Sequence, residues 1–342
     1  MTTISAEKED APGQAPGGAA TLIRVMPAII LAAAIIGVIA VLATVNQAQG
    51  GRDWYRGLAG GSGLYRTDTL FARLLPFVAG AALSVALLER GRQRKETLAT
   101  GDTLRRHEWS EVAVHWLNAL GVILCLITAM WLLRWFGRPF SLETTYILHF
   151  AGAGMIVAAV THHIVYERVG GGTGLIPRRR ADVKNALAEV VGYTGVYRGS
   201  RGVFGIQLPV AVRRPAQRVL RRLKLVPDPS GKYLATEKVL SYTVWTLLLG
   251  VIVITGVIKT LNYLFSIPGG LLQWTTFLHD QATIFFVVFL GIHVGALVLV
   301  PRNWPLLKSM FTTRISRAYA RDHLPLWVPE EDGSEGGQSS TP

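Results

Sequence analysis

Histidine is the residue type on which any metal chemistry of this chain would rest. The 342-residue sequence has eight histidines but a single cysteine, Cys125, which lies in an apolar run. One cysteine cannot form an internal disulfide, a cysteine-based zinc or iron–sulfur site, or the Cys-x-x-Cys-His motif that attaches haem covalently. Imidazole rings are sufficient for another task, since two of them supply both axial ligands of a b-type haem.

Four histidines are spaced so that they can meet in two pairs. His279 and His293 lie 14 residues apart in one apolar run, so on a helix they share a face and stand roughly 21 Å apart along it. His115 begins one earlier run and His149 begins the next, which places them at opposite levels of an antiparallel helix pair. The predicted pairs are therefore His149 with His279 at an outer level and His115 with His293 at an inner level.

Each pair of facing imidazoles meets the ligand requirement of a low-spin haem in a helical bundle. Two stacked b-type haems would form an electron path across the bilayer. Glycines close to the ligands would let a flat macrocycle approach the backbone: these are Gly152, Gly154, Gly291 and Gly295. A lone histidine in a membrane helix is often only a hydrogen-bonded packing residue, but four at matched depths favour ligation.

The remaining histidines are given other roles. His163 also lies 14 residues after His149, so His162 or His163 is an alternative to His115 as inner ligand, although we expect both at the membrane interface beside Tyr166 and Glu167. We expect His107 and His323, which fall in polar segments, on the solvated surface.

The elements that position these histidines are apolar runs long enough to cross a membrane. Half of the residues are hydrophobic and 17% are charged, while the formal net charge is +13. A basic nucleic-acid-binding protein would spread its charge over polar surface instead. About 20 apolar residues span a bilayer, and six runs qualify, at about residues 22–44, 70–88, 112–135, 146–166, 239–265 and 274–300. No partnership with nucleic acid is expected.

Lysine and arginine alternate between the connections, which predicts the orientation. They gather after the second run, after the fourth run and in the C-terminal tail, whereas the turns around Arg138 and at 266–273 nearly lack them. Cytoplasmic loops carry this excess of cations. We therefore expect a multi-pass protein of a bacterial cytoplasmic (inner) membrane with both termini in the cytoplasm.

The polar ends of the chain predict disorder at 1–19 and 330–342, because they contain too little apolar surface to offset the entropy of ordering. The first run is an alternative candidate for a cleaved signal peptide. Its apolar core exceeds the usual length of such segments and acidic residues precede it, which favours a membrane span.

Several motifs carry a family resemblance. In chain order they are His115-Trp116, Tyr146-Ile147-Leu148-His149, His162-His163, Thr255-Gly256-Val257-Ile258, His279 with His293, and Arg317-Ala318-Tyr319-Ala320-Arg321-Asp322-His323-Leu324-Pro325-Leu326-Trp327. Together they resemble the gamma subunit of membrane-bound respiratory formate dehydrogenases, a four-helix cytochrome b. The resemblance covers about residues 105–329. It extends more loosely to the cytochrome b anchors of hydrogenases and thiosulfate reductases.

The runs and the resemblance together predict an all-α integral membrane protein with six transmembrane helices. A two-helix membrane extension over 20–104 precedes a four-helix di-haem cytochrome b domain over 105–329, which includes a basic cytoplasmic loop over 167–238. The resemblance implies the same four haem ligands as the depth argument: His115, His149, His279 and His293.

The resemblance also implies an electron-transfer role without a catalytic centre in this chain. Electrons would come from an iron–sulfur beta subunit and a molybdenum or tungsten catalytic alpha subunit on the outer face. They would pass through two haem b groups to menaquinone or ubiquinone. Related complexes assemble into oligomers, so a higher oligomer is a further expectation. The short outer turns leave room for such a partner.

The quinone site departs from the family pattern. The family has a segment similar to Gly-Lys-Tyr-Asn-Ala-Gly-Gln-Lys, whereas this chain has Gly231-Lys232-Tyr233-Leu234-Ala235-Thr236-Glu237-Lys238. A carboxylate near the inner haem could exchange quinone protons, so Glu237, Lys232 and the nearby His293 are quinone-site candidates. The alternative is a helix start in which Thr236 is the N-cap and Glu237 favours the helix dipole.

Two further alternatives remain open. The basic stretch Pro215–Leu225 is typical of an amphipathic helix on anionic membrane lipid, but it could bind a protein or only fix the topology. The histidines could also serve a proton channel or transporter. That function predicts further carboxylates inside the spans, and Asp280 is nearly the only one.

Overall fold

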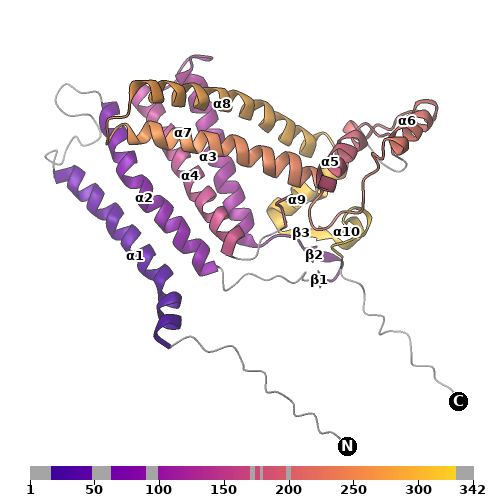
Figure 1. Cartoon of the computed structure of the whole chain (residues 1–342), viewed down its shortest axis with the longest axis horizontal. Coiled ribbons are helices and arrows are strands. Elements are labelled where there is room, and N and C mark those ends of the chain that lie inside the picture. Colours follow the sequence, from indigo (N-terminus) through magenta and orange to yellow (C-terminus); the bar gives the residue numbers. More distant parts are fainter. Residues whose placement is uncertain are drawn as a thin grey trace, which may run out of the picture.

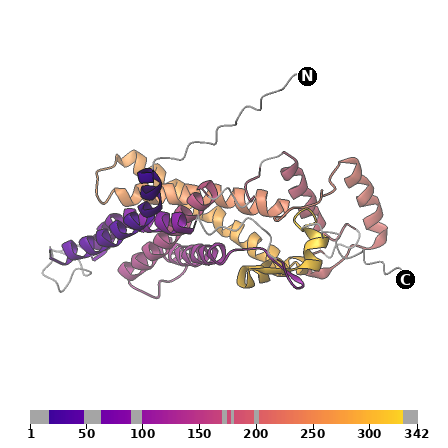
Figure 2. The same cartoon turned by 90° about the horizontal axis from the view of Figure 1, so that it is seen from below.

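The fold is dominated by long helices gathered at one side of the molecule, with a small mixed layer at the other end (Figures 1 and 2). A computed structural model describes residues 17–47, 63–89, 99–169, 174–177, 180–197 and 202–328. The expected disorder at 1–19 and 330–342 lies outside these residues, apart from 17–19 at the start of the first helix.

Six helices in the described residues are long and apolar enough to cross a membrane. They are α1 (Gly17–Gln47), α2 (Gly63–Glu89), α3 (Trp109–Leu132), α4 (Leu142–Val169), α7 (Trp245–Leu261), which continues the π-helical η3 (Glu237–Val244), and α8 (Gly269–Val298). Each of the six predicted runs overlaps one of them over most of its length, and the runs 112–135, 239–265 and 274–300 extend slightly past the helix end. The predicted all-α membrane architecture is therefore confirmed.

Local sequence explains where the helix that carries His115 begins. Glu108 precedes α3 and its backbone N–H donates to the Glu111 carboxylate at 3.1 Å, within a capping box. Such a box satisfies backbone donors that a helix start would leave unpaired. The chain leaves the helix through Arg134, whose φ of 58° is left-handed and breaks the helical path.

Small residues bring α3 and α4 into direct backbone contact. A Cβ atom added at Gly121 would lie 2.8 Å from the carbonyl oxygen of Gly152, and one at Gly152 would lie 2.8 Å from that of Gly121. Neither position can hold a larger residue without separating the helices. Gly152, expected to admit a macrocycle, therefore serves the contact between two helices.

One hydrophobic cluster joins four of the membrane helices. Its buried members are Val122 and Leu126 of α3, Ile156 of α4, Leu249 of α7 and Phe286 of α8. Because the α3–α4 pair and the α7–α8 pair both contribute, the cluster fixes how the two antiparallel pairs face each other.

The N-terminal extension is packed against the four-helix bundle through α2. The ring of Phe71 on α2 stacks on Phe150 of α4 at a centroid distance of 4.7 Å. Farther along the same pair, His162 Nε2 lies 2.9 Å from the Glu89 carboxylate. Helix α1 packs on α2, where the ring of Phe77 lies against Gly37.

A small layer closes the end of the bundle where α3 begins and α8 ends. It contains α5 (Arg180–Gly192), η2 (Val203–Gly205), α6 (Val210–Arg222), η4 (Pro301–Asn303), α9 (Trp304–Thr312) and α10 (Arg317–His323), with the strands β1 (Ala99–Thr100), β2 (Thr103–Arg105) and β3 (Arg314–Ser316). The strands form an antiparallel sheet in the order β1-β2-β3. A second cluster supports it: Leu104, Leu234, Leu306, Ile315, Ala320 and Leu324.

This layer overturns the expectation that His107 is solvated. The side chain is 7% exposed and its Nδ1 lies 3.3 Å from the Glu111 carboxylate, because the layer folds over a segment that is polar in sequence. His323 is half-buried, and its ring stacks on Tyr319 at 4.3 Å.

The alternative in which Thr236 caps a helix start is half right, because Glu237 does lie in the first turn but the Thr236 side chain makes no capping bond. Thr236 has helical backbone angles, and its N–H and hydroxyl both donate to the Glu189 carboxylate at 2.8 Å. Glu189 also accepts from the N–H of Ala235 at 3.1 Å. A carboxylate from α5, far away in the sequence, thus accepts the hydrogen bonds of the unpaired N–H groups at the start of the helical segment.

The ion pair between Arg106 and Glu237 ties this layer to the bundle and can be tested. Both Glu237 oxygens lie 2.8 Å from Nη2 of Arg106, whose side chain is 2% exposed. Arg106→Ala should lower the free energy of unfolding by about 3 kcal/mol, because it leaves a half-buried carboxylate unpaired. The measurement is thermal unfolding of the full-length protein in detergent.

The matched control is Arg105→Ala, which removes the more exposed ion pair with Glu108. It should cost about 1 kcal/mol or less. Equal melting temperatures for the two variants would show that the Arg106 pair does not support the fold.

Candidate functional site

The predicted outer pair lines one cavity of the bundle. His149 of α4 and His279 of α8 both border a space of about 320 Å³, and they lie close enough to interact electrostatically. Its walls come from α3, α4, α7 and α8, and also from α2 through Phe71 and Leu75. The extension therefore contributes to the site, which the sequence had left open.

A threonine on the preceding helix holds each of these two imidazoles. Thr128 Oγ1 of α3 lies 2.9 Å from His149 Nδ1, and Thr255 Oγ1 of α7 lies 2.9 Å from His279 Nδ1. Each hydroxyl also donates to the carbonyl four residues earlier, at 2.7 Å to Leu124 and 2.5 Å to Val251. The two arrangements are equivalent on opposite sides of the cavity.

These contacts select one tautomer of each ring. A hydroxyl has a single proton, and here it is given to the helix carbonyl, so the threonine oxygen accepts the proton of Nδ1. The lone pair of each histidine is then on Nε2, the nitrogen left for a ligand. A hydrogen bond at the other ring nitrogen is the usual way in which proteins orient a metal-binding histidine.

The remaining wall suits a large, mainly apolar group that carries negative charge at its edge. Most lining residues are aliphatic or aromatic, but Lys259 also borders the cavity. No described residue forms an ion pair with it, and Asp280 attracts it only at longer range. Gly256 lies against the His279 ring, where a Cβ atom would be 3.4 Å from Cε1. Two free imidazole nitrogens and an unpaired ammonium fit a haem with its carboxylates.

The outer end of the cavity also holds a buried acid. Asp68 of α2 is 4% exposed and bonds to the hydroxyl of Tyr263, while its Oδ1 has no partner in the described part of the chain. Tyr263 itself lines the cavity. A carboxylate from the extension thus reaches the edge of the site, and the sequence analysis missed it.

The predicted inner pair also comes together, though in different surroundings. His115 of α3 and His293 of α8 lie close enough to interact electrostatically. Trp245 and Phe289 flank the His293 ring, each at a centroid distance of 6.2 Å. Among the described residues, no hydrogen bond holds either ring, so both nitrogens of each remain available.

The two alternative inner ligands are placed elsewhere. His162 is paired with Glu89 and stacked on Tyr166 at 5.7 Å. His163 lies 5.6 Å from the Tyr242 ring, and its buried Nε2 has no partner within the described residues.

Two of the three quinone-site candidates, Glu237 and Lys232, belong to the network around Arg106. Glu237 accepts from Arg106 and from the N–H of Leu234 at 2.8 Å, and lies close enough to His293 to interact with it electrostatically. The Lys232 ammonium lies 5.2 Å from the centroid of the Tyr233 ring. Burial lowers the pKa of Lys232, although nearby Glu111 opposes this.

His107, expected on the solvated surface, is instead a buried polar residue at this end. Burial lowers the pKa of its imidazole from an ordinary value near 6.5, although the hydrogen bond to Glu111 opposes this. The ring is therefore neutral at pH 7. Nδ1 donates to Glu111, and the buried Nε2 has no partner in the described part of the chain. Nε2 is thus free to accept a hydrogen bond from a ligand.

A comparison with known families identifies the bundle. The family model for prokaryotic cytochrome b561 matches residues 106–313. The chain belongs to this family. Membership means a membrane protein that binds haem b and transfers electrons, which agrees with the predicted chemistry of the histidines. Among curated proteins, none matches the chain.

The threonine anchors of this cytochrome lead to a direct test. Thr128→Val and Thr255→Val keep the side-chain shape but remove the acceptor for Nδ1, so each should weaken haem retention by on the order of 10- to 100-fold. The measurement is the rate of haem transfer from the purified full-length protein to a haem-scavenging protein.

Thr246→Val is the matched control, because that hydroxyl donates to the Tyr242 carbonyl on the same helical segment and contacts no imidazole. It should leave retention unchanged. Unchanged retention in Thr128→Val and Thr255→Val as well would mean that the threonines do not orient ligands.

Proposed function

We propose that this chain is the di-haem membrane subunit of a respiratory oxidoreductase of the formate dehydrogenase type. It carries electrons from an iron–sulfur subunit on the outer face to quinone on the cytoplasmic side. The observation that supports this most directly is the outer pair of histidines, each with Nδ1 engaged by a threonine and Nε2 left for iron.

In this proposal His149 and His279 hold the outer haem, and His115 and His293 hold the inner one. When bound, haem iron takes up and releases one electron at a time. Thr128 and Thr255 keep the outer imidazoles in the tautomer that ligates. The rings of Trp245 and Phe289 pack beside His293 and exclude water from the inner level.

Lys259 completes the outer site in this proposal. Its ammonium has no ion-pair partner among the described residues, and an unpaired charge in the membrane is costly. The carboxylates of haem provide the missing partner, so Lys259 would position the group and favour its reduced, more negative state.

The donor is inferred from the family resemblance. The tail from Arg317 to Trp327 that contributes to this resemblance lies beyond the matched residues 106–313. It forms α10 and contributes Ala320 and Leu324 to the second hydrophobic cluster. Partners would be an iron–sulfur beta subunit and a molybdenum or tungsten alpha subunit. The distribution of Lys and Arg supports an orientation with both termini in the cytoplasm.

The quinone, menaquinone or ubiquinone, would bind near the inner pair. Glu237 and Lys232 remain candidates there, and His107 joins them because its buried Nε2 can accept the hydroxyl proton of a quinol. Glu237 is already engaged by Arg106, so its role would be to hold the network together. Lys232, whose pKa is lowered by burial, is better suited to exchange protons.

Ligand substitution separates the two levels. The dithionite-reduced minus oxidised absorption spectrum of the purified protein should show two b-type haems per chain. His293→Ala should abolish the inner haem and spare the outer one, because the substitution removes a ligand of the inner haem alone. His323→Ala, which alters a histidine in the end layer, should keep both. Two haems at full occupancy in His293→Ala would contradict the proposed pairing.

Lys259 can be tested through the redox potential of the outer haem. Lys259→Met removes a positive charge near the iron and should lower the midpoint potential of one haem by on the order of tens of millivolts. Lys259→Arg should restore it. Potentiometric titration of both haems is the measurement. If neither midpoint potential shifts, Lys259 does not lie close to a haem.

A further inference from the structure

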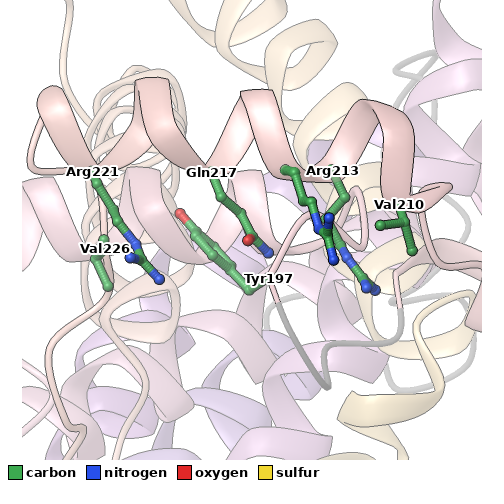
Figure 3. A pocket seen from close by; sticks show the side chains of 7 residues that line it. Tyr197, Val210, Arg213, Gln217, Arg221 and Val226 are labelled. Atoms are coloured by element: carbon green, nitrogen blue, oxygen red, sulfur yellow. The ribbon is translucent and has the colours of Figure 1, made fainter.

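A second cavity lies in the end layer, between α6 and the segment before it. Its volume is about 470 Å³, and its lining residues are Tyr197, Val210, Arg213, Arg214, Gln217, Arg221 and Val226. Figure 3 shows the labelled side chains of α6 directed toward the same side, where Tyr197 lies. The spacing explains this, because residues 210, 213, 214, 217 and 221 recur every three or four positions and share a helix face.

The cleft concentrates positive charge that no carboxylate neutralises within the described part of the chain. Three of its lining residues are arginines, and α6 has no acidic residue. Among the described residues, no carboxylate forms an ion pair with Arg213, Arg214 or Arg221. Guanidinium groups gathered on one wall repel one another, so an anion is the group that would stabilise this arrangement.

Hydrogen bonds hold the two walls together. The hydroxyl of Tyr197 donates to the Leu225 carbonyl at 2.5 Å, and the amide of Gln217 donates to the Val196 carbonyl at 2.7 Å. Gly195 has a φ of 74°, and a Cβ atom there would lie 2.6 Å from the Ile206 carbonyl. The cleft is therefore built into the fold and does not depend on α6 alone.

The approach to the cleft is fastened to the end of a membrane helix. The N–H of Phe204 donates to the carbonyl of Leu299, directly after α8, at 2.7 Å. Phe204 is 68% exposed and Ile206 is 64% exposed. Exposed apolar side chains beside the end of a spanning helix are typical of the lipid interface. Cationic side chains nearby then lie at the level of the lipid headgroups.

We propose that this cleft binds the phosphate group of an anionic phospholipid. Arginine recognises phosphate through paired N–H donors, and three arginines match a group that carries several acceptor oxygens. Phe204 and Ile206 would contact the acyl region of the same leaflet. The site is separate from the histidine pairs and does not depend on haem binding.

The test compares two triple variants of the full-length protein purified in a neutral detergent. Arg213→Gln/Arg214→Gln/Arg221→Gln empties the cleft of charge. Arg218→Gln/Arg222→Gln/Lys224→Gln removes the same charge from residues outside the lining. Native mass spectrometry measures bound phosphatidylglycerol and cardiolipin, with phosphatidylcholine as the neutral reference.

The cleft variant should lose anionic lipid by on the order of tenfold or more, while the control stays within about twofold of the unmodified chain. Equal losses in both variants would show general surface attraction and overturn the site, as would no loss in either. Binding of inorganic pyrophosphate, but not of lipid, with the same arginine dependence would assign the cleft to a soluble phosphate and overturn the lipid assignment.

A charge-preserving variant covers the case in which the first triple does not fold, as judged by size-exclusion chromatography. Arg213→Lys/Arg214→Lys/Arg221→Lys keeps the positive charge but loses the paired donors. It should bind anionic lipid more weakly than the unmodified chain. Unchanged binding would show that the paired donors of the arginines do not recognise the lipid phosphate, which would contradict the proposal.

Discussion

An imidazole in a bilayer must find a partner for its polar nitrogens inside the protein, because the surrounding hydrocarbon offers none. His149 and His279 meet this requirement on one side only, through Thr128 and Thr255. Each threonine can accept from the ring because its own proton is already committed to a helix carbonyl. The opposite nitrogen is left for a ligand, so the chemistry of the site follows from a hydrogen-bond constraint.

This constraint also explains why the helices are arranged in antiparallel pairs. Each outer histidine and its threonine lie on consecutive membrane helices, α3 with α4 and α7 with α8. The hydrogen bond forms only if the backbones approach closely at the correct level. Gly121 and Gly152 provide that approach for the first pair. A larger residue at either position would separate Thr128 from His149.

The membrane spans, and which histidines lie close together, could be predicted from the sequence because both depend on short-range periodicity. Helical rise and run length place His279 and His293 at two levels without any tertiary information. The threonine anchors were not predicted, since a helical threonine can bond to its own backbone alone and nothing local marks Thr128 or Thr255. The sequence signal that could have identified them is a threonine on the helix before the histidine, at the same membrane depth.

The end layer could not be predicted for a different reason. Its strands have two or three residues each, too short for any alternation to show. Its central contacts join residues that are distant in sequence: Glu189 bonds Thr236 across 47 positions, and Arg106 bonds Glu237 across 131. His107 looked solvated because its neighbours are polar, but Arg106 beside it is itself buried by the layer.

The same layer connects the inner histidines to the rest of the molecule. Arg106 precedes α3, which carries His115, and Glu237 begins the helical segment that packs beside α8, which carries His293. An ion pair between them therefore couples the starts of two helices that no threonine links at this level. The outer pair is held by hydrogen bonds within helix pairs, whereas the inner pair is positioned from outside the bundle. The inner rings consequently keep both nitrogens available, whereas each outer ring keeps one.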